Sequence, residues 1–224
     1  MDLSRYERLL NAKSKGVGMS NSTIDIVNAT FDANPAYEKV NYNNEEVDAI
    51  YKLHKYLSHT VYLTFRPNFQ INKGDYVEFK SKQYIVNDFV QNEIYPKAEI
   101  LFCNNTLRWR DSFGTDFEFP IFITGNSLVL DDAKYSNNNR YVLRSDSNLH
   151  LKIQYNEITN KIVPTQRFVI NNKVYDATTI SDTEVYEGKG FLEISLTSTA
   201  KSTTDNVDNS GIADNSGNSG WGEW

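Results

Sequence analysis

The chain has 224 residues, a hydrophobic fraction of 39% and a formal net charge of -6 at pH 7. This length allows one large or two small domains, and we expect two small ones. The absence of a long apolar run excludes a transmembrane helix. The acidic balance argues against a protein whose main task is to grip phosphates, because such proteins concentrate Lys and Arg. Nothing resembles a secretory signal, so we expect assembly in the cytoplasm.

The N-terminal residues 1–43 predict a short helix followed by an extended arm. Four apolar side chains recur at helical spacing, and Lys15 and Gly16 end the pattern. From Val17 to Tyr42, Asn and Ser are frequent and apolar residues are scattered, which favours an arm over a packed domain. Such an arm usually lies on its own domain or on a neighbouring subunit. The candidate partner-binding residues of the helix are Leu3, Tyr6, Leu9 and Leu10.

Residues 44–134 are expected to form a first β-module. Its opening segment, 44–58, fits both a helical and a strand periodicity. We favour a helix, because Asn44 followed by Glu45 and Glu46 places a capping residue and acids at a helix start. The next segment, 60–65, alternates as a strand. This module therefore combines a helix with several strands.

A strand meander between residues 69 and 110 is the clearest pattern in the chain. Residues 76–80 alternate, a tight connection follows at 81–83 and residues 84–90 run back, which predicts a β-hairpin. Two further strands follow, and in the second of them Leu107 and Trp109 share one face. Strands that bury one face together place apolar side chains inside. The candidate core residues, with one from the second module, are Val77, Phe79, Ile85, Cys103, Leu107, Trp109 and Phe168.

A polar stretch at residues 135–139 is the predicted domain boundary. Beyond it, residues 140–196 contain regularly spaced strands divided by Asn, Asp and Gly turns, which is typical of a small sandwich or barrel. Residues 197–224 are rich in Ser, Asn and Gly and predict a disordered tail. Its end carries Trp221 and Trp224, which are candidate partner-binding anchors or simply an incidental exposed end. The fold class is therefore mainly all-β: two small antiparallel β-barrel or sandwich modules with an N-terminal helix and arm and a disordered C-terminal tail.

No pattern for catalysis, cofactor binding or metal binding emerges. The HExxH, CxxC, P-loop and GxSxG motifs are absent, and His54, His59 and His150 lack a convincing third ligand. The single cysteine, Cys103, is best explained as a buried core residue. We therefore expect no catalytic residues, no cofactor and no metal. A stacking platform around Trp109 for sugars or single strands is an alternative to a core aromatic beside surface arginines.

Several blocks of sequence, taken in their order along the chain, resemble one family. The chain is similar to structural proteins of tailed phages of Gram-positive bacteria, which are encoded near portal and capsid genes and act at the head-to-tail junction. The resemblance covers roughly residues 69–196. The blocks are KGDYV (73–77) with YIV (84–86), NEIYPKAEI (92–100) with CNNTLRW (103–109), YNE (155–157) with RFVI (167–170), and GFLEISL (190–196).

The resemblance implies a head-completion or stopper-type connector in the phage neck. Such a protein forms an oligomeric ring of small β-barrels that connects or closes the portal and provides the surface for tail attachment. The implied partners are other copies of the chain, the portal protein and tail or neck proteins, with packaged DNA at most passing through the lumen and no membrane. The implied location is the virion, after assembly in the host cytoplasm.

Two other functions remain open from the sequence. One is a peripheral binding module of the virion, such as a head fibre, a decoration protein or a carbohydrate-binding adhesin that uses the C-terminal β-module. The other is a tail-tube or tail-completion protein, which has the same all-β composition. An exposed aromatic groove with a polar rim would favour the binding module, whereas a ring interface would favour the connector.

Overall fold

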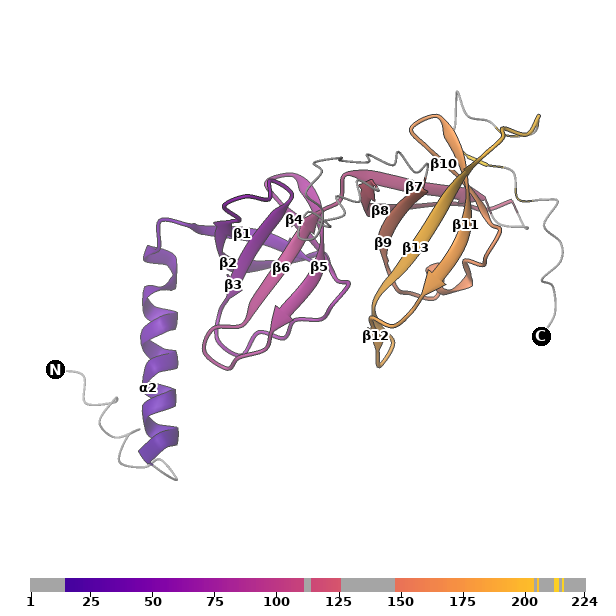
Figure 1. Ribbon diagram of the computed structural model, residues 1–224. Helices are drawn as coiled ribbons and strands as arrows, with labels where there is room; N and C mark the ends of the chain where they lie inside the picture. The colour runs from indigo at the N-terminus through magenta and orange to yellow at the C-terminus, as the bar shows by residue number, and fades with distance from the viewer. Residues whose placement is uncertain are drawn as a thin grey trace, which may run out of the picture. The chain divides into compact units, whose positions relative to one another are not determined.

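The computed structural model describes residues 15–110, 114–125 and 148–203, together with residues 205, 212, 213 and 215. The chain is mainly β and divides into two compact units, Met1–Phe102 and Cys103–Trp224 (Figure 1). Each unit contains one barrel-like antiparallel sheet. The predicted fold class is therefore confirmed, and the boundaries of its elements differ in three places.

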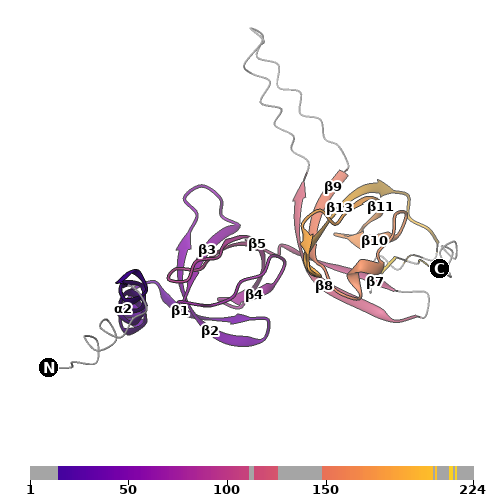
Figure 2. The ribbon, with the colours of Figure 1, turned by 90° about the horizontal axis from the view of Figure 1, so that it is seen from below.

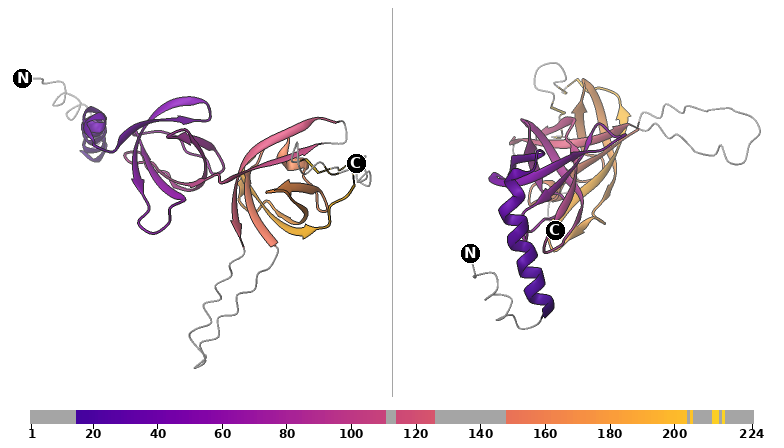
Figure 3. Two further views of the ribbon diagram at one scale, coloured as in Figure 1. Left: turned by 90° about the horizontal axis from the view of Figure 1, so that it is seen from above. Right: turned by 90° about the vertical axis from the view of Figure 1, so that its left-hand side faces the viewer.

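The first difference is a helix where the sequence predicts an extended arm. The helix α2 (Lys15–Thr30) and the 3-10 helix η1 (Phe31–Ala33) lead into the first barrel (Figure 3). Glycine, serine and asparagine give α2 a low intrinsic helix propensity, so local sequence alone does not favour it. Val27 and Phe31 are buried at its C-terminal end and provide tertiary contacts that the sequence pattern does not reveal.

The first barrel is a closed antiparallel sheet in the order β1-β2-β3-β6-β5-β4 (Figure 2). Each strand is hydrogen-bonded to a neighbour on both sides, so this sheet has no edge strand. The strands are β1 (Tyr37–Tyr42), β2 (Glu45–Leu53), β3 (Thr60–Phe65), β4 (Tyr76–Phe79), β5 (Lys82–Val90) and β6 (Lys97–Phe102).

The second difference is at residues 44–58, where the predicted helix is wrong. Residues 45–53 form β2, which pairs with β1 and β3. Asn43 and Asn44 have φ values of 49° and 69°, so they form a two-residue turn of left-handed residues rather than a helix cap. Lys80 and Ser81, with φ values of 51° and 59°, make the same kind of connection in the predicted hairpin between β4 and β5.

The second unit contains a sheet in the order β10-β11-β13-β9-β8-β7, with β12 paired to β13. The 3-10 helix η3 (Thr159–Lys161) precedes β10. The two end strands approach each other where the Asn105 amide donates to Asn171 Oδ1 at 3.1 Å. The strands are β7 (Asn105–Arg110), β8 (Asp116–Gly125), β9 (Asn148–Gln154), β10 (Arg167–Ile170), β11 (Lys173–Ser181), β12 (Val185–Tyr186) and β13 (Lys189–Thr199).

The third difference is the domain boundary. The sequence places it at residues 135–139, between modules 44–134 and 140–196, but the structure places it between Phe102 and Cys103. The reason is strand pairing: β8 pairs with β7 on one side and, through Phe122–Gly125, with β9 on the other. The strands β7 and β8 therefore belong to the second unit, and the first barrel already begins at β1.

Each unit has its own apolar core, and all seven candidate core residues are buried. Trp109 lies in the second core rather than the first, against Phe117 and Phe119 with ring centroids at 5.5 Å and against Phe168 at 6.0 Å. Its side chain is 4% exposed, which leaves no open face for a stacking platform. Burial of Cys103 raises the pKa of its thiol to about 12, so it is a poor nucleophile.

Candidate functional site

Three clusters in the described residues have the geometry of contact sites. The predicted partner-binding residues Leu3, Tyr6, Leu9, Leu10, Trp221 and Trp224 lie outside the described part of the chain. Within that part, no group of His, Cys, Asp or Glu side chains is arranged to hold a metal ion. No described helix is long and apolar enough to cross a membrane.

The Arg66 anchor, formed by Arg66 and the groups around its guanidinium, holds the helical segment to the first barrel. Its Nε donates to Asp48 Oδ2 at 2.6 Å, on strand β2. On the helical side, the guanidinium pairs with Asp32, donates to the Asn28 carbonyl at 3.2 Å and lies 4.8 Å from the centre of the Phe31 ring. One side chain therefore joins the barrel to the C-terminal end of α2 and to η1.

A tyrosine reinforces the anchor from strand β1. The Tyr37 hydroxyl donates to Asp48 Oδ1 at 2.7 Å. This hydrogen bond, together with the Arg66 guanidinium, holds the pKa of Asp48 below its ordinary value against the opposing effect of burial. Asp48 therefore stays ionised at neutral pH and accepts both contacts.

Helix α2 carries an exposed apolar residue next to its buried one. Val27 is buried, whereas the adjacent Ile26 is 45% exposed. The Arg66 guanidinium contacts the C-terminal end of α2 at the Asn28 carbonyl. The helix is therefore anchored at this end and presents an apolar side chain to solvent beside the anchor.

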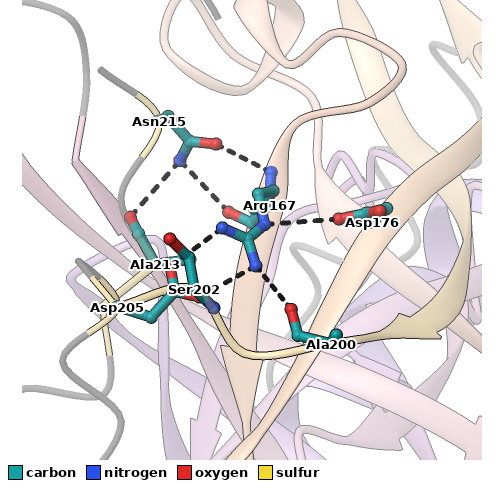
Figure 4. A network of polar contacts seen from close by, with 7 residues as sticks. All are labelled: Arg167, Asp176, Ala200, Ser202, Asp205, Ala213 and Asn215. Atoms are coloured by element: carbon teal, nitrogen blue, oxygen red, sulfur yellow. Dashed lines mark hydrogen bonds and ion pairs between the residues drawn. The ribbon is translucent and has the colours of Figure 1, made fainter. Parts of the chain in front are cut away.

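The Arg167 clasp holds the segment after β13 against the first residue of β10 (Figure 4). The guanidinium donates to Asp205 Oδ1 at 3.1 Å and to Asp205 Oδ2 at 2.8 Å, and also to the Ala200 carbonyl at 2.9 Å. The Ser202 amide donates to Asp205 Oδ2 at 2.7 Å, and the side chain of Asp205 is 0% exposed. Asp176 adds an ion pair to Arg167 Nε at 3.6 Å. A buried carboxylate is therefore matched by a bidentate guanidinium.

The same clasp also binds the backbone of Arg167. The Arg167 amide donates to Asn215 Oδ1 at 2.8 Å, and Asn215 Nδ2 donates to the Arg167 carbonyl at 3.1 Å (Figure 4). Ala213 is 0% exposed and packs in a small cluster with Val169 and Val174. These contacts lie in the segment predicted to be a disordered tail. Its Ser- and Asn-rich composition contains no signal for them, because they depend on residues far away in the sequence.

The outer-face pocket lies on the second sheet and has a volume of about 300 Å³. His150 Nδ1 and Ser195 Oγ are 3.0 Å apart, and Lys152 Nζ pairs with Glu193 Oε1 at 3.2 Å. The strand register places these residues opposite each other on β9 and β13. The lining residues are Phe122, Thr124, His150, Leu151, Lys152, Thr179, Ser181, Glu193, Ile194 and Ser195.

The lining of the outer-face pocket combines apolar and polar side chains. Phe122, Leu151 and Ile194 contribute apolar surface, and Thr and Ser hydroxyls lie beside the Lys152–Glu193 ion pair. The pocket therefore offers both kinds of contact to a ligand.

Comparison with protein families divides the chain as the structure does. Residues 8–102 match the YomX N-terminal domain, and residues 105–197 match the YomX C-terminal domain. Neither the curated proteins nor the solved structures gave a match. The partners of Arg167 in the clasp, Asp205 and Asn215, lie beyond the second matched domain. The chain therefore belongs to the phage-associated family that these two YomX domains define, and it contains both domains in order.

Proposed function

We propose that this phage-associated protein is a structural component of the virion neck. In this proposal, copies of the chain form a ring that connects or closes the portal and gives the tail its attachment surface. The resemblance of residues 69–196 to proteins of the head-to-tail junction supports this station, and the family match supports the association with phage. Its partners are further copies of the chain, the portal protein and tail or neck proteins.

The observation that carries the proposal is the exposed apolar side chain on α2 beside its anchor to the barrel. A helix of 16 residues with this composition gains little stability from its own sequence. The Arg66 anchor holds its C-terminal end, and Ile26 is exposed beside it. A helix held in this way is suited to pack on a neighbouring copy, which would bury Ile26 and stabilise the remaining turns.

The charge of the chain fits a ring through which DNA passes. A net charge of -6 does not favour tight binding of phosphates to the wall of a lumen. Nucleic acid would therefore slide through rather than adhere. No enzymatic step is part of this proposal.

The test is a phage that lacks this chain. We expect heads that package the genome but neither retain it nor attach tails, because the ring that adapts the portal to the tail is missing. The deletion phage is then complemented with the wild-type chain or with Arg66→Gln, which keeps a polar side chain but removes the charge that holds α2. The variant should restore genome retention and tail attachment only weakly. Full heads with normally attached tails in the deletion phage would exclude the neck assignment.

The outer-face pocket favours one alternative, a peripheral binding module of the virion. Its hydroxyls and the Lys152–Glu193 pair could contact a hydroxyl-rich ligand such as a saccharide. Under this alternative, the deletion phage would have intact heads and tails but adsorb poorly to cells. The same deletion strain therefore separates the two functions.

A further inference from the structure

The Arg167 clasp gives the first residue of β10 the hydrogen bonds that a neighbouring strand would give. In an antiparallel ladder, a hydrogen-bonded residue pair exchanges both amide-to-carbonyl bonds. At Arg167, the side-chain amide of Asn215 supplies the acceptor at 2.8 Å and the donor at 3.1 Å (Figure 4). Strand β10 stands at one end of the sheet order, with β11 as its hydrogen-bonded strand partner. The clasp therefore satisfies a backbone amide and carbonyl of β10 from a segment outside the sheet.

Two further contacts make the clasp selective for the segment that occupies it. Ala213 is fully buried in its cluster with Val169 and Val174, so a methyl group fills that position. The carboxylate of Asp205 is fully buried against the Arg167 guanidinium, and both of its oxygens accept hydrogen bonds from it. An acid, a small residue and an asparagine are thus recognised together. This combination is supplied by the C-terminal segment of the chain itself.

We propose that the Arg167 clasp also binds the C-terminal segment of a second copy, so that exchanged segments link neighbouring copies in the assembly. The inference rests on the proposed function only in assuming that several copies stand side by side. A segment exchanged between copies presents the same Asp205, Ala213 and Asn215 to the clasp, and exchange of identical elements is a low-cost route to oligomers. The local concentration of neighbouring copies then decides whether the segment docks on its own chain or on a second copy.

The experiment mixes two full-length variants, one carrying Val174→Cys and the other Ala213→Cys. Val169→Cys replaces Val174→Cys in a parallel mixture, so that the result does not depend on the geometry of one disulfide. The native Cys103 can stay, because it is buried and its thiol has a pKa of about 12. Under mild oxidation we expect disulfide-linked pairs containing one chain of each kind. Their yield should rise with protein concentration.

Two controls show that linkage depends on the clasp. Adding Asn215→Ala to the Ala213→Cys chain removes two hydrogen bonds and should lower the yield of linked pairs about tenfold. A chain carrying Glu187→Cys, in the turn between β12 and β13, should not pair selectively with the Ala213→Cys chain.

A chain with both Val174→Cys and Ala213→Cys separates the possible failures. If it closes an internal disulfide while the mixed single variants form no linked pairs at any concentration, the segment is only an internal cap and the proposed exchange is wrong. If neither it nor the equivalent chain with Val169→Cys closes internally, the docking itself is wrong. Neither result bears on the neck assignment, which the deletion phage tests. The two proposals can therefore be refuted independently.

Discussion

Replacing Trp109 with alanine should destabilise the second unit by about 3 to 5 kcal/mol, the usual cost of deleting a buried large aromatic side chain. The Trp109 side chain is 4% exposed, and its ring lies against Phe117 and Phe119 at 5.5 Å and against Phe168 at 6.0 Å. Three rings therefore lose a contact surface at once. The strands β7 and β8 are paired along their length, so the backbone can close the cavity only in part.

The effect should be confined to the second unit, because each unit has its own core. With a urea dependence of about 2 kcal/mol per molar, a loss of 4 kcal/mol lowers the midpoint by about 2 M. Amide hydrogen exchange followed by mass spectrometry along a urea series reports the two units separately. Tyr186→Ala is the matched control in the same unit: this side chain is 78% exposed, and its loss should change stability by less than about 0.5 kcal/mol.

Two results would refute this reasoning about Trp109. A second-unit midpoint that barely moves would mean that the indole is not part of the core. A first-unit midpoint that falls by the same amount would mean that the chain unfolds as one cooperative body. The division between Phe102 and Cys103 would then not separate independent folding units.

Three other predictions concern the first unit. Arg66→Gln should speed amide exchange in α2 while exchange in the barrel stays slow, because Arg66 joins the helical segment to the barrel. Tyr42→Phe should lower the free energy of unfolding by about 1 to 3 kcal/mol in denaturant titration, because the Tyr42 hydroxyl donates to the buried Asp75 at 2.6 Å. Acidification should loosen the Arg66 anchor and so speed amide exchange in α2. The hydrogen bond from Tyr37 lowers the pKa of Asp48 from its ordinary 3.8. The contribution of Asp48 to stability is therefore complete above pH 3.8 and is lost as pH falls through the lower pKa of the folded state. Protection of α2 that persists at a pH well below 3.8, where Asp48 is protonated in the folded protein as well, would contradict this.

Elements defined by alternation were predictable from the sequence. The hairpin between β4 and β5 stands where the pattern places it, with β4 alternating between half-buried and buried residues. The segment at 45–53 shows the limit of this approach, because its residues fit two periods equally well. The deciding signal was the preceding Asn43-Asn44 dipeptide, whose residues tolerate left-handed conformations and favour a two-residue hairpin turn.

Features that depend on distant residues could not be predicted. Helix α2 has poor local propensity, and its C-terminal end is held by Arg66, which lies at the end of β3. The domain boundary is set by the pairing of β8 with β9, which are separated by more than twenty residues. Asp205 and Asn215, which bind Arg167 in the clasp, lie more than thirty residues further along the chain. The composition of each segment predicts its local propensity, but it does not show which distant residues the segment will contact.

The two units offer different means of assembly, because only one of their sheets has ends. In the first barrel every strand has two hydrogen-bonded neighbours, so no strand of this sheet offers a free edge to a partner. In the second unit β10 ends the sheet order, and at Arg167 its backbone amide and carbonyl are bonded by a side chain. An exposed sheet edge invites pairing with any other chain, so proteins cover such edges. Covering this one with a segment that recognises Arg167 through Asp205 and Asn215 would restrict that pairing to copies of the same chain, which is the selectivity that a ring of identical subunits requires.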